Sequence, residues 1–232
     1  MGIAGQWGHF MRCRAVWLAS ACAIALGASA EAAPVTWYAG VEGGWNQGID
    51  ADARYTGTVT TPVTHVVHTK AEAQFDSGWA LMATLGMEIG GGWRMEGEVA
   101  YRSNDLNLAI PATPVTVTKG GSLDDLSFMY NWLLDLPLNT SGNFKLSLGF
   151  GMGLDYGKLK TDLGFEASEW SIAYQGIAGV SFAIDDETDL TLNFRHFRTS
   201  EPKFKDFGVV DSTVRFDEIG QDTVTIGLRH AL

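Results

Sequence analysis

The sequence predicts an all-β protein, an eight-stranded antiparallel transmembrane β-barrel with an up-and-down meander. Apolar and polar residues alternate with period two through eight segments that follow the first thirty residues. The connections between these segments are alternately short and long, which is the layout of a transmembrane barrel. Aromatic residues also recur 8 to 12 positions apart on the apolar face. Along a tilted strand this spacing spans about 20–30 Å of the barrel axis, which matches an apolar band about 25 Å tall.

Composition excludes two other classes of protein. The 232 residues carry a formal net charge of −11, so the basic surface of a nucleic-acid-binding protein is absent and no nucleic-acid partner is expected. After the first thirty residues no apolar run reaches the roughly 20 residues that a membrane-spanning helix needs. The hydrophobicity is instead distributed by alternation.

Residues 1–30 are typical of a cleaved signal peptide, which leaves residues 31–232 as the barrel domain. Arg12 and Arg14 precede the apolar stretch 15–27, and residues 28–30 (Ala-Ser-Ala) form a cleavage site, with residues 30–32 (Ala-Glu-Ala) as an alternative. Both cysteines, Cys13 and Cys22, lie in this leader, so the mature chain has no disulfide and no thiolate. Either Met1 or Met11 is the start, and a lipoprotein signal at Cys22 is the competing interpretation.

The eight amphipathic segments are expected in order along the rest of the chain. They are residues 36–46, 78–89, 93–102, 126–136, 144–156, 170–182, 190–195 and 224–232. Short turns are expected at 90–92, 137–143 and 185–187, and long loops at 47–77, 103–125, 157–168 and 199–218. A soluble lipocalin-like barrel also alternates. Two aromatic girdles favour the membrane barrel, and they comprise Trp37, Trp45, Trp79, Trp93, Tyr101, Phe144, Tyr156, Trp170 and Phe182.

The polar face is expected to fill the lumen with an ion network, because a barrel of eight strands is only wide enough for side chains. Its expected members are Glu42, Glu88, Arg94, Glu96, Glu98, Arg102, Lys145, Asp155, Arg195 and Arg229, with Asp135 on the same face. Buried charges in such a lumen must pair. The alternative is a gated conductance pathway in which these pairs rearrange.

Other motifs have a structural and a chemical interpretation. Gly149, Gly151 and Gly153 alternate within a strand and face inward, so they are not a phosphate-binding loop. His65 and His68 are expected in the first long loop, exposed rather than bound to a metal. His196 is followed two residues later by Arg198, where a serine hydrolase would need its nucleophile, so no catalytic residue is assigned.

Basic residues gather around the fourth long loop. They are Arg198, Lys203, Lys205 and Arg215, and Asp206, Asp211 and Asp217 are interleaved with them. The interleaved acids favour an ordinary solvated loop. The alternative is a site for lipopolysaccharide phosphates or an external anionic polymer.

Three stretches resemble a known family. Residues 37–44 (WYAGVEGG) resemble the opening strand of OmpA-like outer-membrane barrels, and residues 190–199 resemble the seventh strand of its small porin and surface-antigen group. Residues 225–232 resemble the terminal strand that serves these proteins as an assembly signal. Two positions depart from the pattern, with Leu232 where Phe is usual and His196 where Tyr is common.

The alternation and this resemblance together imply an outer-membrane protein of a Gram-negative bacterium, with periplasmic termini and four loops outside. A structural or surface-interaction role is expected, without catalysis, metal or cofactor. The expected partners are outer-membrane lipid and lipopolysaccharide, the assembly machinery through the C-terminal strand, and an extracellular ligand or host surface. The alternatives are a porin-like narrow diffusion pore and a lipid A-modifying enzyme.

Overall fold

The computed structural model describes residues 35–61, 63–112, 115–162, 166–205 and 213–232, which fall in the compact unit Pro34–Leu232. The expected signal peptide with its two cysteines lies outside the described residues, as do Asp206 and Asp211. No helix in the described ranges has the length and apolarity needed to cross a membrane.

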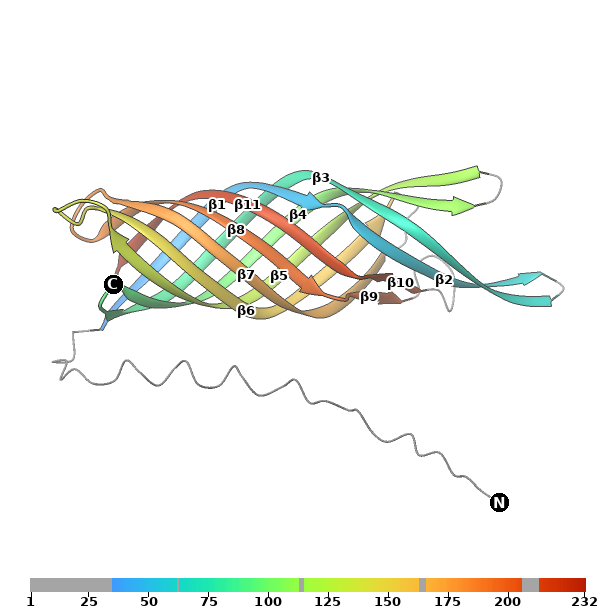
Figure 1. Cartoon of the computed structure of the whole chain (residues 1–232), viewed down its shortest axis with the longest axis horizontal. Coiled ribbons are helices and arrows are strands. Elements are labelled where there is room, and N and C mark those ends of the chain that lie inside the picture. Colours follow the sequence, from blue (N-terminus) through green and yellow to red (C-terminus); the bar gives the residue numbers. More distant parts are fainter. Residues whose placement is uncertain (1–34, 62, 113–114, 163–165, 206–212) are drawn as a thin grey trace, which may run out of the picture. The chain divides into compact units, whose positions relative to one another are not determined.

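All described elements are strands, and eight of them close into an antiparallel barrel (Figure 1). The strands are β1 (Thr36–Ile49), β2 (Ala51–Thr61), β3 (Val63–Gly90), β4 (Trp93–Ala112), β5 (Val115–Pro137), β6 (Phe144–Thr161), β7 (Glu166–Ala183), β8 (Thr188–Ser200), β9 (Lys203–Lys205), β10 (Thr213–Phe216) and β11 (Glu218–Ala231). Each barrel strand pairs with its neighbour in the chain, and β1 closes the sheet by pairing with both β3 and β11. The predicted eight-stranded meander is confirmed.

The three additional strands β2, β9 and β10 prolong the barrel wall. The pairing of β2 with β3 keeps the register of β1 with β3, and the pairing of β10 with β2 keeps that of β11 with β1. In the same way β9 and β10 continue the pairing of β8 and β11. Short breaks at Asp50, at residues 201–202 and at Asp217 interrupt three of the long strands without a change of partner.

The two ends of the barrel differ, as the connection lengths predict. One end, called here the turn end, carries the three short turns and the C-terminal Leu232, whose amide donates to the Trp37 carbonyl (2.8 Å). The first turn is tight because Gly90, Gly91 and Gly92 all have positive φ, which residues with a side chain rarely adopt. The other end, called the hairpin end, carries the long connections (Figure 1).

The prediction that the first two long connections are loops is wrong. Most of residues 47–77 lies in β2 and β3, and most of residues 103–125 lies in β4 and β5. His65 and His68, expected in a loop, lie within β3. Beyond the band of apolar residues, antiparallel neighbours still hydrogen-bond each other's backbone N–H and C=O groups. The wall therefore continues as β-hairpins.

Candidate functional site

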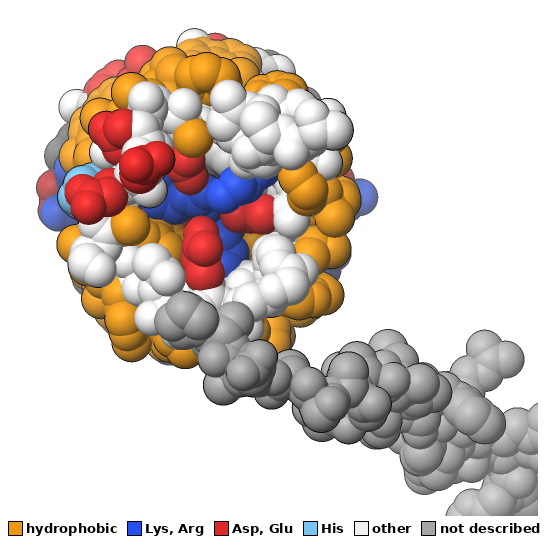
Figure 2. Space-filling model, turned by 90° about the vertical axis from the view of Figure 1, so that its left-hand side faces the viewer, with side chains coloured by type: hydrophobic (Ala, Val, Ile, Leu, Met, Phe, Trp, Pro, Cys, Tyr) orange, Lys and Arg blue, Asp and Glu red, His pale blue; other side chains and the backbone are white. Residues whose placement is uncertain are grey.

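The outer face of the barrel is apolar. All six tryptophans in the described part of the chain lie on it, and their exposed fractions range from 42 to 54 %. Viewed at the turn end, hydrophobic side chains form the perimeter, with Lys and Arg side chains at the centre and acidic side chains beside them (Figure 2). The charged side of each strand therefore faces inward.

The nine aromatic residues predicted for the girdles fall into two levels. Trp37, Trp93, Phe144 and Phe182 lie towards the turn end, while Trp45, Trp79, Tyr101, Tyr156 and Trp170 lie towards the hairpin end. In the second level, called here the hairpin-side ring, Trp79 contacts Tyr101 with ring centroids 5.3 Å apart, and Tyr156 contacts Trp170 at 5.1 Å. Phe144 and Phe182 are opposite each other in register at the first level.

Both faces of the wall change character at the hairpin-side ring. On β6, Asp155 is buried in the lumen and Tyr156 points outward, whereas a few residues later Lys158 points outward and Leu159 is fully buried. A wall in hydrocarbon needs an apolar outer face, whereas a wall in water is stable with its apolar face inside. The ring therefore marks the edge of the lipid-facing band, and beyond it the barrel is organised like a water-soluble protein.

A first ion cluster fills the lumen near the turn end. The Arg94 guanidinium donates to Asp135 (3.0 Å) and pairs with Glu96. Arg229 shares Asp135 (3.3 Å) and also pairs with Asp189. The two arginines thus pair with three carboxylates, and the five side chains come from the four strands β4, β5, β8 and β11, which ties opposite sides of the wall together.

A second ion cluster lies at the middle of the lumen. Arg195 is 2 % exposed and donates to Glu42 (2.7 Å) and to Glu98 (3.1 Å). Arg102, which is fully buried, lies 3.9 Å from Glu98 and 4.2 Å above the ring of Phe197. Neutral side chains complete the bonds of the two glutamates, namely Asn131, Gln175, Asn193 and Thr225. Both glutamates are thus paired and hydrogen-bonded, as burial requires. Arg102 donates from Nη1 to the Ser127 hydroxyl (2.8 Å), while its Nε and Nη2 atoms have no hydrogen-bond partner within the described residues.

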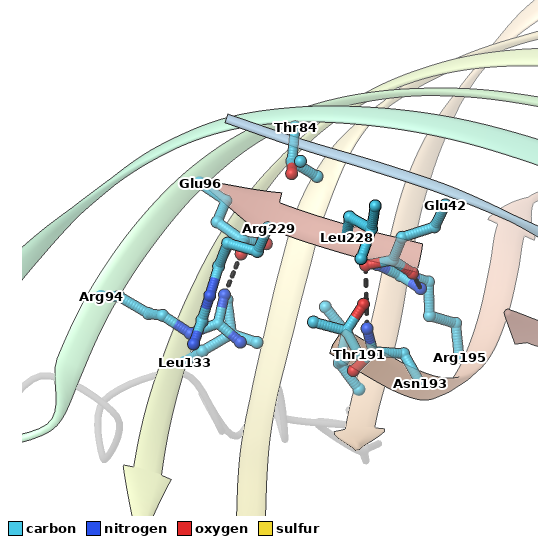
Figure 3. A pocket seen from close by; sticks show the side chains of 12 residues that line it. Glu42, Thr84, Arg94, Glu96, Leu133, Thr191, Asn193, Arg195, Leu228 and Arg229 are labelled. Atoms are coloured by element: carbon cyan, nitrogen blue, oxygen red, sulfur yellow. Dashed lines mark hydrogen bonds and ion pairs between the residues drawn. The ribbon is translucent and has the colours of Figure 1, made fainter. Parts of the chain in front are cut away.

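Only a small cavity separates the two clusters. It encloses about 10 Å³, which is room for about one water molecule. In Figure 3, Arg94, Glu96 and Arg229 border it on one side, and Glu42 and Arg195 border it on the other. The side chains of Leu133 and Thr191 line it as well. Side chains therefore fill the lumen here and leave no channel-sized space.

Eight of the ten residues predicted for the ion network are buried inside the barrel. Asp155 is among them, but its Oδ1 atom makes no hydrogen bond within the described residues. Glu88 and Lys145 instead line a cavity of about 460 Å³ at the mouth of the turn end. Asp135 is shared by both arginines of the first cluster. Sequence reasoning missed Asp125 and Asp189, because the expected strands 126–136 and 190–195 began one residue after them. Both aspartates lie on the inward-facing side of their strands.

An apolar cluster closes the lumen at the hairpin end, and the sequence analysis did not predict it. We call it the plug, and it consists of Ala53, Ala73, Phe75, Leu106, Leu123, Leu159, Ala167, Phe204, Val214, Phe216 and Ile219. Phe216 packs against Phe204 and Phe75, with ring centroids 5.8 and 6.4 Å apart. The plug joins the prolonged strands of all four hairpins to one another.

The remaining motifs take structural positions. A Cβ atom on Gly151 would overlap the inward-pointing amide of Asn131, so this glycine makes room for a lumen side chain. His196 lies on the outer face, where its Nδ1 atom is 2.6 Å from Asp222. Its register partners are Gly176 and Asp222, so neither offers a nucleophilic hydroxyl. Within the described ranges no three His, Cys, Asp or Glu side chains gather as metal ligands.

Asp124 and Asp185, which both lie outside the lipid-facing band, have lowered pKa values. Burial opposes ionisation of Asp124, but the Lys160 ammonium (2.6 Å) and the Ser103 hydroxyl outweigh it and hold the pKa of Asp124 below its usual range. At the turn end, the backbone amide of Glu187 (2.9 Å) and bonds from Thr188 lower the pKa of Asp185. Both carboxylates are thus held ionised as structural acceptors.

Comparison with known proteins gives one family and a consistent fold. The family described as outer membrane protein beta-barrel domain matches residues 16–228. The crystal structure of Neisserial surface protein A is similar with a TM-score of 0.50 at 14 % identity, over 85 % of this chain and 99 % of that chain. The outer membrane protein OprG from Pseudomonas aeruginosa is similar with a TM-score of 0.51 at 13 % identity, over 83 % and 95 % of the two chains. No curated protein matches the sequence.

Proposed function

Because the chain belongs to the outer membrane protein beta-barrel domain family and lies in the outer membrane, we propose that it is a closed, non-catalytic barrel that presents a rigid surface outside the cell. In this arrangement the hairpin end is extracellular and the turn end is periplasmic, since barrels of this kind have long connections outside and short turns inside. The expected partners are those that such a surface can reach, namely lipopolysaccharide and an external ligand.

The plug is the observation that carries this proposal. Phe204, Val214 and Phe216 from β9 and β10 pack on Phe75 and Leu123 from the walls of two other hairpins. A surface supported by its own apolar core loses little conformational freedom on binding, so it suits recognition. The described strands β9 and β10 of the fourth long connection, which was expected to be a solvated loop, are thereby held against the other hairpins.

Three further features support a closed, non-catalytic barrel over the two alternatives. The plug and the ion clusters occupy the lumen in series, and each would have to move before an ion could pass. The cavity between the clusters holds about one water molecule. A lipid A-modifying activity is less well supported, because a hydrolase needs a nucleophile within hydrogen-bond reach of its base. Neither register partner of His196, Gly176 or Asp222, offers a hydroxyl, and the residue two positions further on is Arg198.

The proposal predicts that the refolded protein does not conduct. In a planar bilayer at moderate voltage we expect no single-channel steps from the wild-type protein, because buried ion pairs and an apolar plug both obstruct the lumen. An established porin inserted into the same membrane serves as the positive control, and heat-modifiable gel mobility verifies that the test protein is folded. Reproducible steps from folded protein would support the pore instead.

A further inference from the structure

A row of cations crosses the extracellular sheet of the hairpin end. Lys70 on β3 is opposite Arg54 on β2, Arg54 is opposite Arg215 on β10, and Arg215 is opposite Lys203 on β9. These four strands lie next to one another in the sheet (Figure 1). At the usual spacing between strands the row is about 14 Å long. Lys205 lies two residues further along β9, on the same face.

The row faces water rather than the plug. Lys70, Lys203 and Lys205 are exposed, and the side chains of Arg54 and Arg215 are 64 and 39 % exposed. Their chain neighbours on the opposite face of the same sheet, such as Phe204 and Val214, are buried in the plug. The sheet is thus apolar underneath and carries the row on top, where the exposed Asp52 lies two residues from Arg54 on the same face.

This arrangement places like charges next to one another. Like charges directly opposite in neighbouring strands destabilise a sheet. Arg54 is paired with Asp217 (3.3 Å) and Arg215 with Glu201, but such exposed pairs contribute little and exchange readily with other anions. Among the described residues, the three lysines of this face form no ion pair. Positive charge gathered in one row stands out in a chain whose net charge is −11.

We infer that this row, with Lys205, binds an extended anionic polysaccharide, which specifies a ligand class for the proposed surface-interaction function. A straight line of exposed cations on an open sheet matches a chain that carries sulfate or phosphate groups at intervals better than it matches one enclosed ion. Arg54 lies nine residues beyond Trp45 of the hairpin-side ring, and along a strand tilted as in such barrels this spans about 20–25 Å of the barrel axis. The row therefore stands above the lipid headgroups, at the level of sugar chains.

The test measures binding of dextran sulfate to the full protein in lipid vesicles, with uncharged dextran of the same length as the control ligand. The wild-type protein is expected to bind dextran sulfate in a salt-dependent manner and to ignore uncharged dextran. Lys70→Gln combined with Lys203→Gln is expected to weaken binding at least tenfold, whereas Lys70→Arg with Lys203→Arg keeps it. Lys158→Gln, on β6 and outside the row, is the matched control and should leave affinity within twofold of the wild type.

Competition distinguishes the two sources of the ligand. Displacement of dextran sulfate by purified lipopolysaccharide assigns the row to the sugar phosphates of the cell's own surface, and its absence assigns the row to an external polysaccharide. Equal binding of both dextrans, or equal losses in the double variant and in Lys158→Gln, would overturn the inference. Such a result leaves the closed-barrel proposal intact, because conductance tests that proposal separately.

Discussion

Arg195→Met is expected to lower the free energy of unfolding of the barrel by about 3–5 kcal/mol. The substitution nearly keeps the volume of the side chain but leaves Glu42 and Glu98 without the guanidinium that bonds both of them. Uncompensated carboxylates in a water-poor lumen are costly, because their attraction to Arg195 is what offsets their lost hydration. Urea-induced unfolding in lipid vesicles, followed by tryptophan emission, measures the change.

Two controls separate the cost of leaving buried carboxylates unpaired from the cost of lost side-chain packing. Adding Glu42→Gln and Glu98→Gln to Arg195→Met neutralises the cluster and is expected to restore most of the stability, since a neutral replacement of a buried ion pair is often tolerated. Lys158→Met breaks an exposed pair with Glu166 and should cost less than about 1 kcal/mol. If Arg195→Met and Lys158→Met cost the same, the ion clusters do not hold the lumen closed.

Phe216→Ala is expected to open the hairpin end without unfolding the barrel. The ring is fully buried between Phe75 and Phe204, and removing such a side chain typically costs about 3–5 kcal/mol. That loss falls on the prolonged strands alone, because the lipid-facing wall and its ion clusters lie below the plug. Trypsin should therefore cleave the folded variant at Lys203, Lys205 or Arg215, since proteolysis reports local opening.

The matched control for this experiment is Phe182→Ala. Phe182 is 49 % exposed on the lipid-facing wall at the turn end, so its loss should not expose the hairpin end to trypsin. Mass spectrometry locates the cut, and heat-modifiable mobility shows whether the barrel stays folded. Identical trypsin resistance of Phe216→Ala and wild-type protein would mean that the plug does not hold the hairpins.

Sequence alone was sufficient for the part of the wall that touches lipid. There the outer face of each strand meets lipid and the inner face meets the charged lumen, so apolar and polar side chains alternate strongly. In Phe150–Tyr156 of β6, for example, Asp155 points inward and Tyr156 outward. Glycines such as Gly90 and Gly92 correctly predicted a short turn between two strands. The alternation also assigned most of the charges that meet in the lumen, because period two fixes the face of each residue.

Beyond the hairpin-side ring the same reasoning failed for a physical reason. Water replaces lipid outside the wall, so the residues that point into the barrel change from polar to apolar. On β4, for example, the inward-pointing side chain is Arg102 in the lipid-facing part and Leu106 beyond it. A prediction that requires polar residues on the inner face therefore places the end of the strand too early. The plug also depends on pairing across the chain, since Phe75 and Phe216 are neighbours only because the barrel closes. The cation row likewise required the register of four strands.

The central claim is that the apolar side of each strand faces lipid and the charged side faces the lumen. Quenching of tryptophan emission by brominated lipid tests it most directly, because all six tryptophans within the described ranges are on the outer face. Protein purified from outer membranes and refolded into vesicles of brominated lipid should emit much less light than in the same lipid without bromine, whereas urea-unfolded protein should emit equally in both. Equal emission of the folded protein in the two lipids would contradict the claim, since its tryptophans would then be shielded from hydrocarbon.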